Sequence, residues 1–577
     1  MNKANQYFLN VKKKIPCAIL AGFTPGMMFF FFGIIDIFGN NRDEFMFKFG
    51  DFGLTIFMIA LAAGLIFAAL IAFLPGYASS VVFGIAVWLS VMGYIQSIAF
   101  NGSGALRADT GATESGALDA VDLAVWIITL VMFVTAAVLI KKFDVLKNAF
   151  VIALIAICVI MLTGCIMQIG NIIQEPDSSA DDVLPPETKE AYAKNSYLSS
   201  RGLTEVSESG NVIIFLIDRF DVNYYKEAVE QQPAFFDGLD GFTYFSDNIS
   251  LYSRTYPAVA TMITGVDNDF SQNAENYFHN AYTGSPFLKD LAANNYKIKI
   301  YSQKYYAYRT GEPLVGIADN LSITSAYKIA NKNRLINNLI SLSAYRYLPN
   351  VFKSRLNIST ASFYGIVEAE GNDPIFETDD ANTCRQILDS KLTFDGNEKS
   401  YIFIHLSGCH DPYSIDENAE PVNNSDVISH LSGCFKMIYK YIDDLKELGV
   451  YDKSTIIITG DHPSAISDSD IPSQTRLTAL FVKPAGVRGE LAYSSAEVSQ
   501  ENLIPTIISS AGISTDNDYG LSYFEIPENE NRKRYHKFEL YIGEKDTQIV
   551  TLEVTGDGTD FNNWNVFSTE NIGELYN

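Results

Sequence analysis

Basic residues are scarce in this sequence, and the deficit lies almost wholly in its second part. The chain has 42 Lys and Arg against 67 Asp and Glu, which gives a net charge of −25. Up to about Gly170 there are ten basic and nine acidic residues, whereas the remainder holds 32 and 58. Because phosphate backbones require a basic surface, this balance argues against a nucleic-acid partner. The two parts are expected to lie in different surroundings.

Cysteines are few, and a nucleotide-binding loop is missing. The six cysteines are Cys17, Cys158, Cys165, Cys384, Cys409 and Cys434. The first three fall in apolar stretches, and the last three are too scattered for a disulfide framework or a zinc knuckle. Whether two of the last three form a disulfide stays open. The sequence has no GxxxxGK[ST] loop, so it lacks the P-loop signature of nucleotide hydrolases.

Long apolar runs are abundant in the first part. Five stretches approach the ~20 residues that a membrane-crossing helix needs; they are Ile15–Phe38, Phe52–Leu74, Tyr77–Phe100, Val121–Ile140 and Ala149–Ile169. They are apolar all round, whereas helices of soluble proteins carry a polar face. The sequence therefore predicts a transmembrane domain of five helices over residues 1–173.

The basic residues of the short loops predict the orientation of these helices. If the N-terminus is cytoplasmic, the inner segments carry Lys3, Lys12, Lys13, Lys14, Lys141, Lys142 and Lys147, and the outer loops carry Arg42, Lys48 and Arg107. Seven against three obeys the positive-inside rule. Five crossings then place the rest of the chain outside the cytoplasm. We expect a multi-pass protein of the cell membrane, in contact with the lipid bilayer.

The second part reads as an α/β domain. Residues 174–210 are polar, acidic and contain prolines, which is typical of a linker. Over residues 211–526, apolar runs alternate with helical patterns; the runs are NVIIFLID, YKIKIYSQ, YIFIHLSG, STIIITGD and TALFVKP. This alternation predicts a mostly parallel sheet with helices on both faces. Residues 527–577 are expected to form a β-rich C-terminal extension of that domain.

Three of these apolar runs stop at residues that bind metals or transfer protons. NVIIFLI is followed by Asp218, STIIITG by Asp461 and His462, and YIFIHLSGC by His410. Ligands of open α/β sheets bind beyond the carboxyl ends of the strands. A single acid after a strand is usually a turn residue. Three strands that are each followed by an acid or a histidine, in a chain with only six histidines, predict a functional site.

The predicted site suggests a role for Thr255, in SRTYPAVATMITG. Pro257 suits the first turn of a helix, so Thr255 lies at the N-terminal mouth of a helix that runs to about Thr264. Such a position favours an anion, and metal coordination is one way to activate a hydroxyl nucleophile. The alternative is that Thr255 only caps the helix.

The motifs resemble those of a known superfamily. TYPAVATMITG has the layout of the sulfatase signature, and NVIIFLID, DGFTYFSDNIS, HLSGCHDPY, ITGDHP and NLIPTIISSAGI follow the order of the alkaline phosphatase and sulfatase superfamily. Five membrane helices before such a domain, with threonine as nucleophile, resemble the arrangement of lipoteichoic acid synthases and lipid A phosphoethanolamine transferases. The fold that this resemblance implies is the sulfatase-like α/β fold.

The resemblance implies a metal centre and its nucleophile. Asp218, Thr255, Asp461 and His462 match the ligands of a single divalent metal, and Thr255 also matches the nucleophile. Three oxygens and one imidazole nitrogen suit Mn²⁺, and Zn²⁺ accepts the same donors. Threonine cannot mature to formylglycine as the sulfatase cysteine does, so the resemblance does not extend to sulfatase activity.

The resemblance also suggests residues that contact the substrate. His410 matches the histidine that contacts the phosphoryl group or assists proton transfer, and His405 fits a second histidine of the phosphoethanolamine transferases. For His405 the alternative, a buried imidazole held by hydrogen bonds inside a strand, is the stronger interpretation. For Arg476, Tyr305 and Tyr306 two interpretations stay open, namely the lining of a head-group pocket or an ordinary surface role.

The function implied is transfer of a phosphoglycerol or phosphoethanolamine head group from a membrane phospholipid to an envelope glycan, lipid or polymer, through a phosphothreonine ester. Two alternatives remain. A membrane-tethered phosphodiesterase or phosphatase would give the same ester to water. A non-catalytic envelope protein would keep the fold for binding.

Overall fold

The chain folds into two units, which we describe separately. In the computed structural model, the helical unit comprises Met1–Ser179 and Lys328–Glu368, and the α/β unit comprises Ala180–Tyr327 and Ala369–Asn577. The structure describes residues 3–41, 45, 47–99, 116–139, 144–174, 195–324, 327–356, 358, 360–363, 365–370, 373–423, 425–464, 476–528, 530–541 and 547–573.

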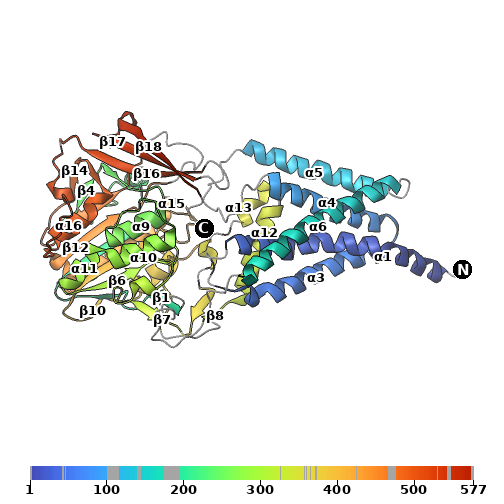
Figure 1. The fold of residues 1–577 in the computed structure, drawn as a ribbon, viewed down its shortest axis with the longest axis horizontal. Coiled ribbons are helices and arrows are strands. Elements are labelled where there is room, and N and C mark those ends of the chain that lie inside the picture. The colour runs from blue at the N-terminus through green and yellow to red at the C-terminus, as the bar shows by residue number, and fades with distance from the viewer. Residues whose placement is uncertain are drawn as a thin grey trace. The chain divides into compact units, whose positions relative to one another are not determined.

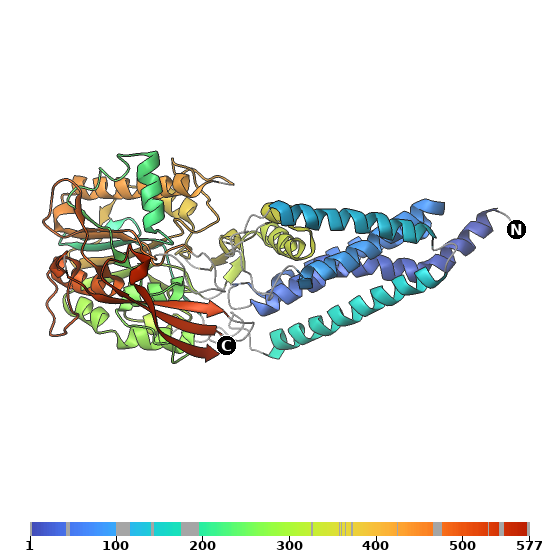
Figure 2. The same ribbon diagram turned by 90° about the horizontal axis from the view of Figure 1, so that it is seen from above.

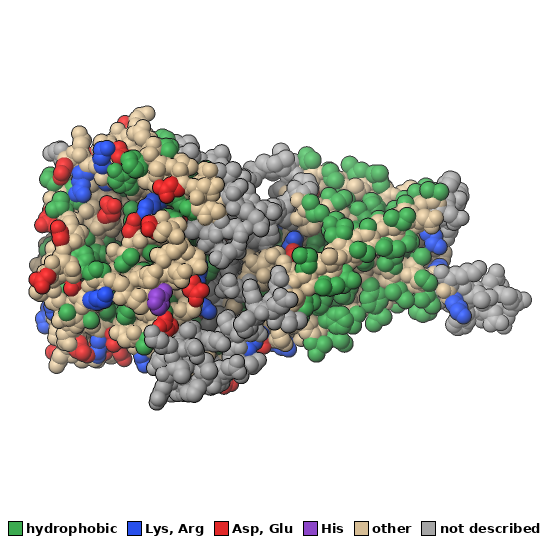
Figure 3. Space-filling view, in the orientation of Figure 1, with side chains coloured by type: hydrophobic (Ala, Val, Ile, Leu, Met, Phe, Trp, Pro, Cys, Tyr) green, Lys and Arg blue, Asp and Glu red, His purple; other side chains and the backbone are tan. Residues whose placement is uncertain are grey.

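The helical unit contains the five predicted spans. Its long helices are α1 (Lys3–Met27), which continues through the π-helical turn η1 (Met28–Phe32) into α2 (Gly33–Asn40), then α3 (Phe49–Phe73), α4 (Gly76–Ala99), α5 (Gly116–Leu139) and α6 (Asp144–Gln174). Five helices are long and apolar enough to cross a membrane, as the sequence predicts. Apolar side chains dominate the visible face of this unit (Figure 3). The loops with Arg42, Arg107, Lys141 and Lys142 lie outside the described residues.

A later segment of the chain returns to the helical unit. Helix α12 (Lys332–Tyr347) and the turn η4 (Asn350–Phe352) pack against the membrane helices, and helix α13 (Lys353–Leu356) packs on α12 and η4. Ser343 Oγ donates a hydrogen bond to the Phe29 carbonyl (2.6 Å), and the Asn350 amide donates to Asp122 Oδ2 (2.7 Å). The sequence assigns residues 328–368 to the catalytic domain. In the structure these residues belong to the helical unit. The sequence does not predict this, because α12 is too short and too polar to be recognised as a partner of membrane helices.

A seven-stranded sheet forms the centre of the α/β unit (Figure 1). Its order is β14 (Ala492–Ser494), β4 (Thr243–Phe245), β13 (Leu480–Lys483), β12 (Ser454–Thr459), β3 (Asn211–Ile217), β11 (Lys399–Leu406) and β6 (Tyr296–Tyr301). Strands β12, β3, β11 and β6 are mutually parallel, and β13 runs antiparallel to its neighbours. The predicted apolar runs form five of these strands, and the sheet is mostly parallel as expected.

Helices cover both faces of the sheet (Figure 2). Val212, Ile214 and Leu216 of β3 face one core with α9 (Thr255–Thr264), α10 (Ala274–Gly284), α11 (Pro286–Ala293) and α16 (Leu503–Ser510). Ile213 and Phe215 face the other core, with α8 (Val222–Gln231), α14 (Asp380–Leu388) and α15 (Val427–Glu447). The strand is buried on both sides, which explains its continuous run of apolar residues.

The two ends of the α/β unit contain further strands. Within the expected linker, β1 (Ser196–Leu198) pairs with β7 (Leu321–Ile323), and β2 (Glu205–Val206) pairs with β10 (Thr393–Phe394). Residues 195–210 are therefore folded, whereas residues 175–194 lie outside the described part. After Pro527, β16 (Lys533–Tyr541), β17 (Thr547–Thr555) and β18 (Trp564–Gly573) form a three-stranded antiparallel sheet.

Candidate metal and nucleophile site

The carboxyl ends of neighbouring strands bring the predicted acids together. Asp218 directly follows β3, and Asp461 comes two residues after β12, which is paired in parallel with β3. Gly460 permits this approach, because a Cβ at that position would lie 2.4 Å from the Phe220 carbonyl oxygen. The Arg219 amide then donates a hydrogen bond to Asp461 Oδ1 (3.0 Å). Backbone geometry thus fixes both carboxylates at one edge of the sheet.

Thr255 is the first residue of α9, and the C-terminal sheet supports the chain that leads to it. The Lys537 amide of β16 donates to the Leu251 carbonyl (2.8 Å), and the Ser253 amide donates to the Lys537 carbonyl (3.1 Å). Gln500 links this segment to the metal-ligand loop, since its side chain accepts from the Leu251 amide (2.7 Å) and donates to the Asp461 carbonyl. The predicted helix is confirmed, and it ends at Gly265 with a left-handed φ of 69°.

Four side chains converge at this point, and we call them the strand-end cluster: Asp218, Thr255, Asp461 and His462. Thr255 Oγ1 lies 3.1 Å from His462 Nε2 and 3.5 Å from Asp218 Oδ2. His462 Nε2 lies 3.4 Å from Asp461 Oδ2. The ligand atoms of the two acids and the histidine all lie within 4.8 Å of one another, and all three residues are buried.

The hydrogen bonds of His462 determine which nitrogen faces the cluster. Nδ1 lies 2.8 Å from the Pro463 carbonyl, an acceptor, so Nδ1 carries the proton. The neutral ring then presents the lone pair of Nε2 to Thr255 and the two acids. A metal-binding histidine commonly has this arrangement, in which the distal N–H is held by a backbone carbonyl.

Two carboxylate oxygens of the cluster are left unsatisfied. Asp218 Oδ1 and Asp461 Oδ2 are buried and accept no hydrogen bond from any described residue. An unpaired buried carboxylate oxygen is strongly unfavourable unless a cation or a donor approaches it. These oxygens, the imidazole nitrogen and the Thr255 hydroxyl form a donor set that fits one divalent cation.

The charges of the cluster perturb its pKa values. Burial alone would raise the pKa of Asp218, but the neighbouring histidines, His410 foremost, lower it to about 2. Burial and then the charge of Asp218 raise the pKa of Asp461. Burial lowers the pKa of His462, which favours the neutral form that can bind a metal.

His405 and His410 lie beside the cluster. The His405 ring is fully buried, shares a hydrogen bond with Ser302 Oγ (2.9 Å), and places Nε2 3.7 Å from Asp218 Oδ2. This distance exceeds a hydrogen bond, so His405 faces Asp218 without donating to it. His410 Nδ1 donates to the Asp411 carbonyl (2.6 Å), which fixes its ring orientation.

The three residues suggested for a head-group pocket have different surroundings. The Tyr306 ring lies 5.7 Å from the His405 ring, so this tyrosine borders the site. Tyr305 adopts a left-handed φ of 91° and stacks under Arg309. Arg476 is buried rather than on the surface, and its Nη1 donates to the Ser464 carbonyl (3.2 Å) just after the Asp-His pair.

His536 is a neighbour of the site that the sequence analysis did not single out. It lies on β16, is fully buried, and its Nδ1 donates to the Ser250 carbonyl (2.8 Å). Burial, and next the charge of Arg476, lower its pKa to about 3. His536 follows the last motif recognised in the sequence, so no motif marked it as a residue of the site.

A second group of buried acid, histidine and thiol lies next to the His410 loop, and we call it the Asp380 cluster: Asp380, His430 and Cys434. Asp380 accepts hydrogen bonds from the amides of Ser407 (2.8 Å) and Gly408 (2.7 Å) and from His430 Nε2 (2.9 Å). His430 Nδ1 accepts from the Ser414 amide (3.0 Å). This cluster therefore holds both ends of the loop that carries His410.

Sequence and structure searches find proteins that are similar to this chain. A sequence search finds lipoteichoic acid synthase 2 of Bacillus subtilis (strain 168), 26% identical over 297 residues, which cover 43% of this chain and 44% of that protein. The match thus spans less than half the length of that relative. Similar solved structures include the lipoteichoic acid synthase LtaP from Listeria monocytogenes, with 14% identity, a TM-score of 0.34 and coverage of 64% and 88% of the two chains.

A protein of the alkaline phosphatase superfamily from Vibrio parahaemolyticus is also similar, with 12% identity, a TM-score of 0.39 and coverage of 68% and 88%. The family model described as Sulfatase matches residues 210–513, which is more than half of the chain and contains the whole strand-end cluster. This chain therefore belongs to the sulfatase family.

Proposed function

We propose that this protein transfers a phosphoglycerol or phosphoethanolamine head group from a membrane phospholipid to an acceptor of the cell envelope. The observation that carries the proposal is the position of Thr255, whose hydroxyl oxygen lies 3.1 Å from His462 Nε2 and 3.5 Å from Asp218 Oδ2 at the start of a helix. Similarity to a lipoteichoic acid synthase and the five apolar helices support a lipid donor and a polymer acceptor.

Asp218, Asp461, His462 and Thr255 would hold one divalent cation, Mn²⁺ or Zn²⁺. When bound, that cation would lower the pKa of the threonine hydroxyl and neutralise charge on the phosphoryl oxygens. Free amides at the start of α9 would favour the negative charge of a phosphoryl group in front of Thr255. The buried acids would keep the cation in place, and Gln500 would keep their loop close to the nucleophile.

The transfer has two steps. In the first, the Thr255 oxygen forms a bond to phosphorus, the bond from phosphorus to the glycerol oxygen of the lipid breaks, and diacylglycerol leaves with a proton. In the second, an acceptor hydroxyl loses its proton as its oxygen bonds to phosphorus, and Thr255 regains its hydroxyl. His410 is the group that we assign to proton transfer, because its loop is held beside the cluster.

Intact-mass analysis of the full chain tests the covalent step. Incubation with phosphatidylglycerol or phosphatidylethanolamine vesicles is expected to add the mass of one phosphoglycerol or phosphoethanolamine to the chain. Digestion should then locate the adduct on the peptide that contains Thr255. Thr255→Ala should abolish the adduct, and Thr283→Ala, an exposed threonine on α10, should keep it. Turnover of lipid without an adduct from either donor would refute the proposal.

Product analysis separates the transferase from the hydrolase. In the presence of an acceptor polyol, the transferase should release diacylglycerol and modify the acceptor, whereas a hydrolase would release free glycerol phosphate or phosphoethanolamine at the same rate with and without it. If the head group is found only as free glycerol phosphate or phosphoethanolamine, with none on the acceptor, the phosphodiesterase alternative is correct and the transferase proposal is wrong.

A further inference from the structure

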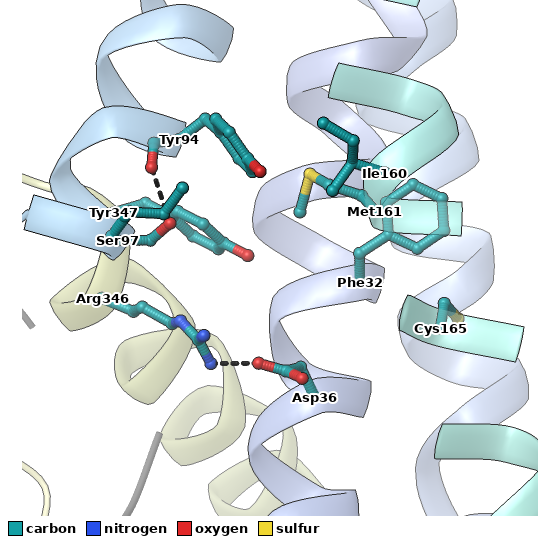
Figure 4. Close-up of a pocket in the computed structure, with 10 residues that line it drawn as sticks. Phe32, Asp36, Tyr94, Ser97, Ile160, Met161, Cys165, Arg346 and Tyr347 are labelled. Atoms are coloured by element: carbon teal, nitrogen blue, oxygen red, sulfur yellow. Dashed lines mark hydrogen bonds and ion pairs between the residues drawn. The ribbon is translucent and has the colours of Figure 1, made fainter. Parts of the chain in front are cut away.

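A charged pair lies among the apolar helices of the helical unit. Asp36 on α2 forms an ion pair and a hydrogen bond with Arg346 on α12 (Figure 4). Charged side chains within membrane spans are unfavourable, and they usually mark a functional position. The pair alone could serve to fix α12 against α2. The space beside it argues for a further role.

A pocket of about 210 Å³ adjoins this ion pair. Tyr94 and Tyr347 direct their hydroxyl groups into the space, and Ser97 lies on the same wall (Figure 4). Polar groups from three separate helices, α2, α4 and α12, therefore face one cavity. Such a cavity suits a ligand with a charged or hydroxylated head.

The opposite side of the pocket is apolar and open. Ile160 of α6 lies across the pocket from Tyr94 (Figure 4), and Ile98 of α4 also lines it; their side chains remain 52% and 65% exposed. These residues lie on membrane-spanning helices, so their exposed surface faces lipid. The medium at the mouth of the pocket is therefore the bilayer, and an occupant would enter from the lipid side.

The depth of the pocket matches the head-group region of the outer leaflet. Asp36 is four residues before the end of α2, and Ser97 is two residues before the end of α4. Both helices end on the extracytoplasmic side if the N-terminus is cytoplasmic. At 1.5 Å per residue, these side chains lie within about 6 Å of the helix ends.

We propose that this pocket binds one phospholipid of the outer leaflet. The phosphodiester head lies against Arg346, the tyrosine hydroxyls contact its polar substituents, and the acyl chains follow the exposed faces of α4 and α6. Asp36 keeps the guanidinium oriented toward the pocket. This site lies in the helical unit and goes beyond the proposed transfer reaction, because it requires no chemistry at Thr255.

Lipid retention by the purified full chain tests the proposal. After exchange from phosphatidylglycerol and phosphatidylethanolamine membranes into neutral detergent, native mass spectrometry should detect one phospholipid per wild-type chain. Asp36→Asn with Arg346→Gln removes both charges together and should lower retention about tenfold, the usual effect of losing a charge-assisted hydrogen bond. Arg334→Gln, exposed on the same helix, is the matched control and should retain the lipid.

A second variant tests the volume without changing the charges. Ser97→Phe should fill the pocket and lower retention to a similar degree, while the ion pair remains. If either variant folds, as judged by thermal melting, and keeps the wild-type amount of phospholipid, the proposal is wrong. An ion pair that only fixes α12 would give no bound phospholipid in the wild type.

The result is independent of the transfer reaction. Thr255→Ala should keep the bound phospholipid even though it forms no adduct. Retained lipid without a wild-type adduct would count against the proposed function alone. A wild-type adduct without retained lipid would count against the pocket alone.

Discussion

Two buried clusters of the α/β unit both combine aspartate with histidine but differ in how their polar atoms are satisfied. In the strand-end cluster, Asp218 Oδ1 and Asp461 Oδ2 have no hydrogen bond with any described residue. In the Asp380 cluster, the carboxylate accepts two backbone amides and an imidazole N–H. Both are groups of residues that could hold a metal by proximity alone. Proximity therefore does not distinguish a metal site from a structural network.

The state of the histidine separates the two clusters. His430 Nδ1 accepts from an amide, so its Nε2 must carry the proton that it donates to Asp380. That nitrogen has no lone pair for a metal. His462 has the opposite arrangement, with Nδ1 donating to a carbonyl and Nε2 facing the cluster. We infer that the strand-end cluster is built for a ligand and the Asp380 cluster for rigidity.

The largest expected effect is the loss of activity in Asp218→Asn. This change removes one negative charge and one metal ligand from the strand-end cluster, so kcat/KM for lipid turnover should fall at least about a thousandfold, or about 4 kcal/mol. Stability without metal should change little, because the lost repulsion between two buried acids offsets the lost attraction to the histidines that lower the pKa of Asp218. Enzyme assays and thermal melting after chelation would measure both. A large loss of metal-free stability would show that Asp218 stabilises the fold, as Asp380 does, and would contradict the distinction between the two clusters.

Asp380→Asn is expected to have the reverse profile. An amide cannot accept from two backbone N–H groups and an imidazole N–H with equal geometry, so the free energy of unfolding should fall by about 3 kcal/mol. Metal content per chain should remain that of the wild type. Asp389→Asn, exposed at the end of α14, serves as the control and should stay within about 0.5 kcal/mol. Lost metal with unchanged stability would assign a metal to the Asp380 cluster.

Much of the strand-end cluster was predictable because its residues follow recognisable strands. Asp218 and Asp461 each come at the end of a continuous apolar run, and parallel strands place their carboxyl ends at one edge. The position of Thr255 was predictable from Pro257 and the first turn of a helix. Local sequence therefore carries the information for this site.

The Asp380 cluster and the return of α12 were not predictable in the same way. Asp380 and His430 are 50 residues apart on two helices, and their contact depends on how α14 packs on α15. The residues of α12 carry no long apolar run that would place them with the membrane helices. His536 likewise reaches the site only through the pairing of β16 with the segment before Thr255. Each of these depends on tertiary packing, which periodicity does not report.

Metal addition should stabilise the wild type more than the variant that lacks a ligand. At a metal concentration about one hundred times the Kd, binding to the folded state alone adds about 2.7 kcal/mol. Asp218→Asn should lose most of this gain. Asp380→Asn should show the full gain, added to a lower free energy of unfolding without metal. Melting curves with and without Mn²⁺ or Zn²⁺ after chelation measure the difference. Equal gains in wild type and Asp218→Asn would exclude the strand-end cluster as the metal site.

The smallest expected effect comes from Cys434→Ala. Its sulfur lies 3.4 Å from Asp380 Oδ2, which is a weak contact beside the three N–H donors that already satisfy this carboxylate. The free energy of unfolding should therefore fall by only about 1 kcal/mol, mainly through the lost volume of a buried sulfur. Metal content and kcat/KM should not change, because the thiol is no ligand and the His410 loop is held by Asp380 and His430. Elemental analysis and urea unfolding of the full chain would test this. A fall in bound metal would mean that the thiol coordinates an ion. The Asp380 cluster would then be a metal site too, and the distinction between the two clusters would be wrong.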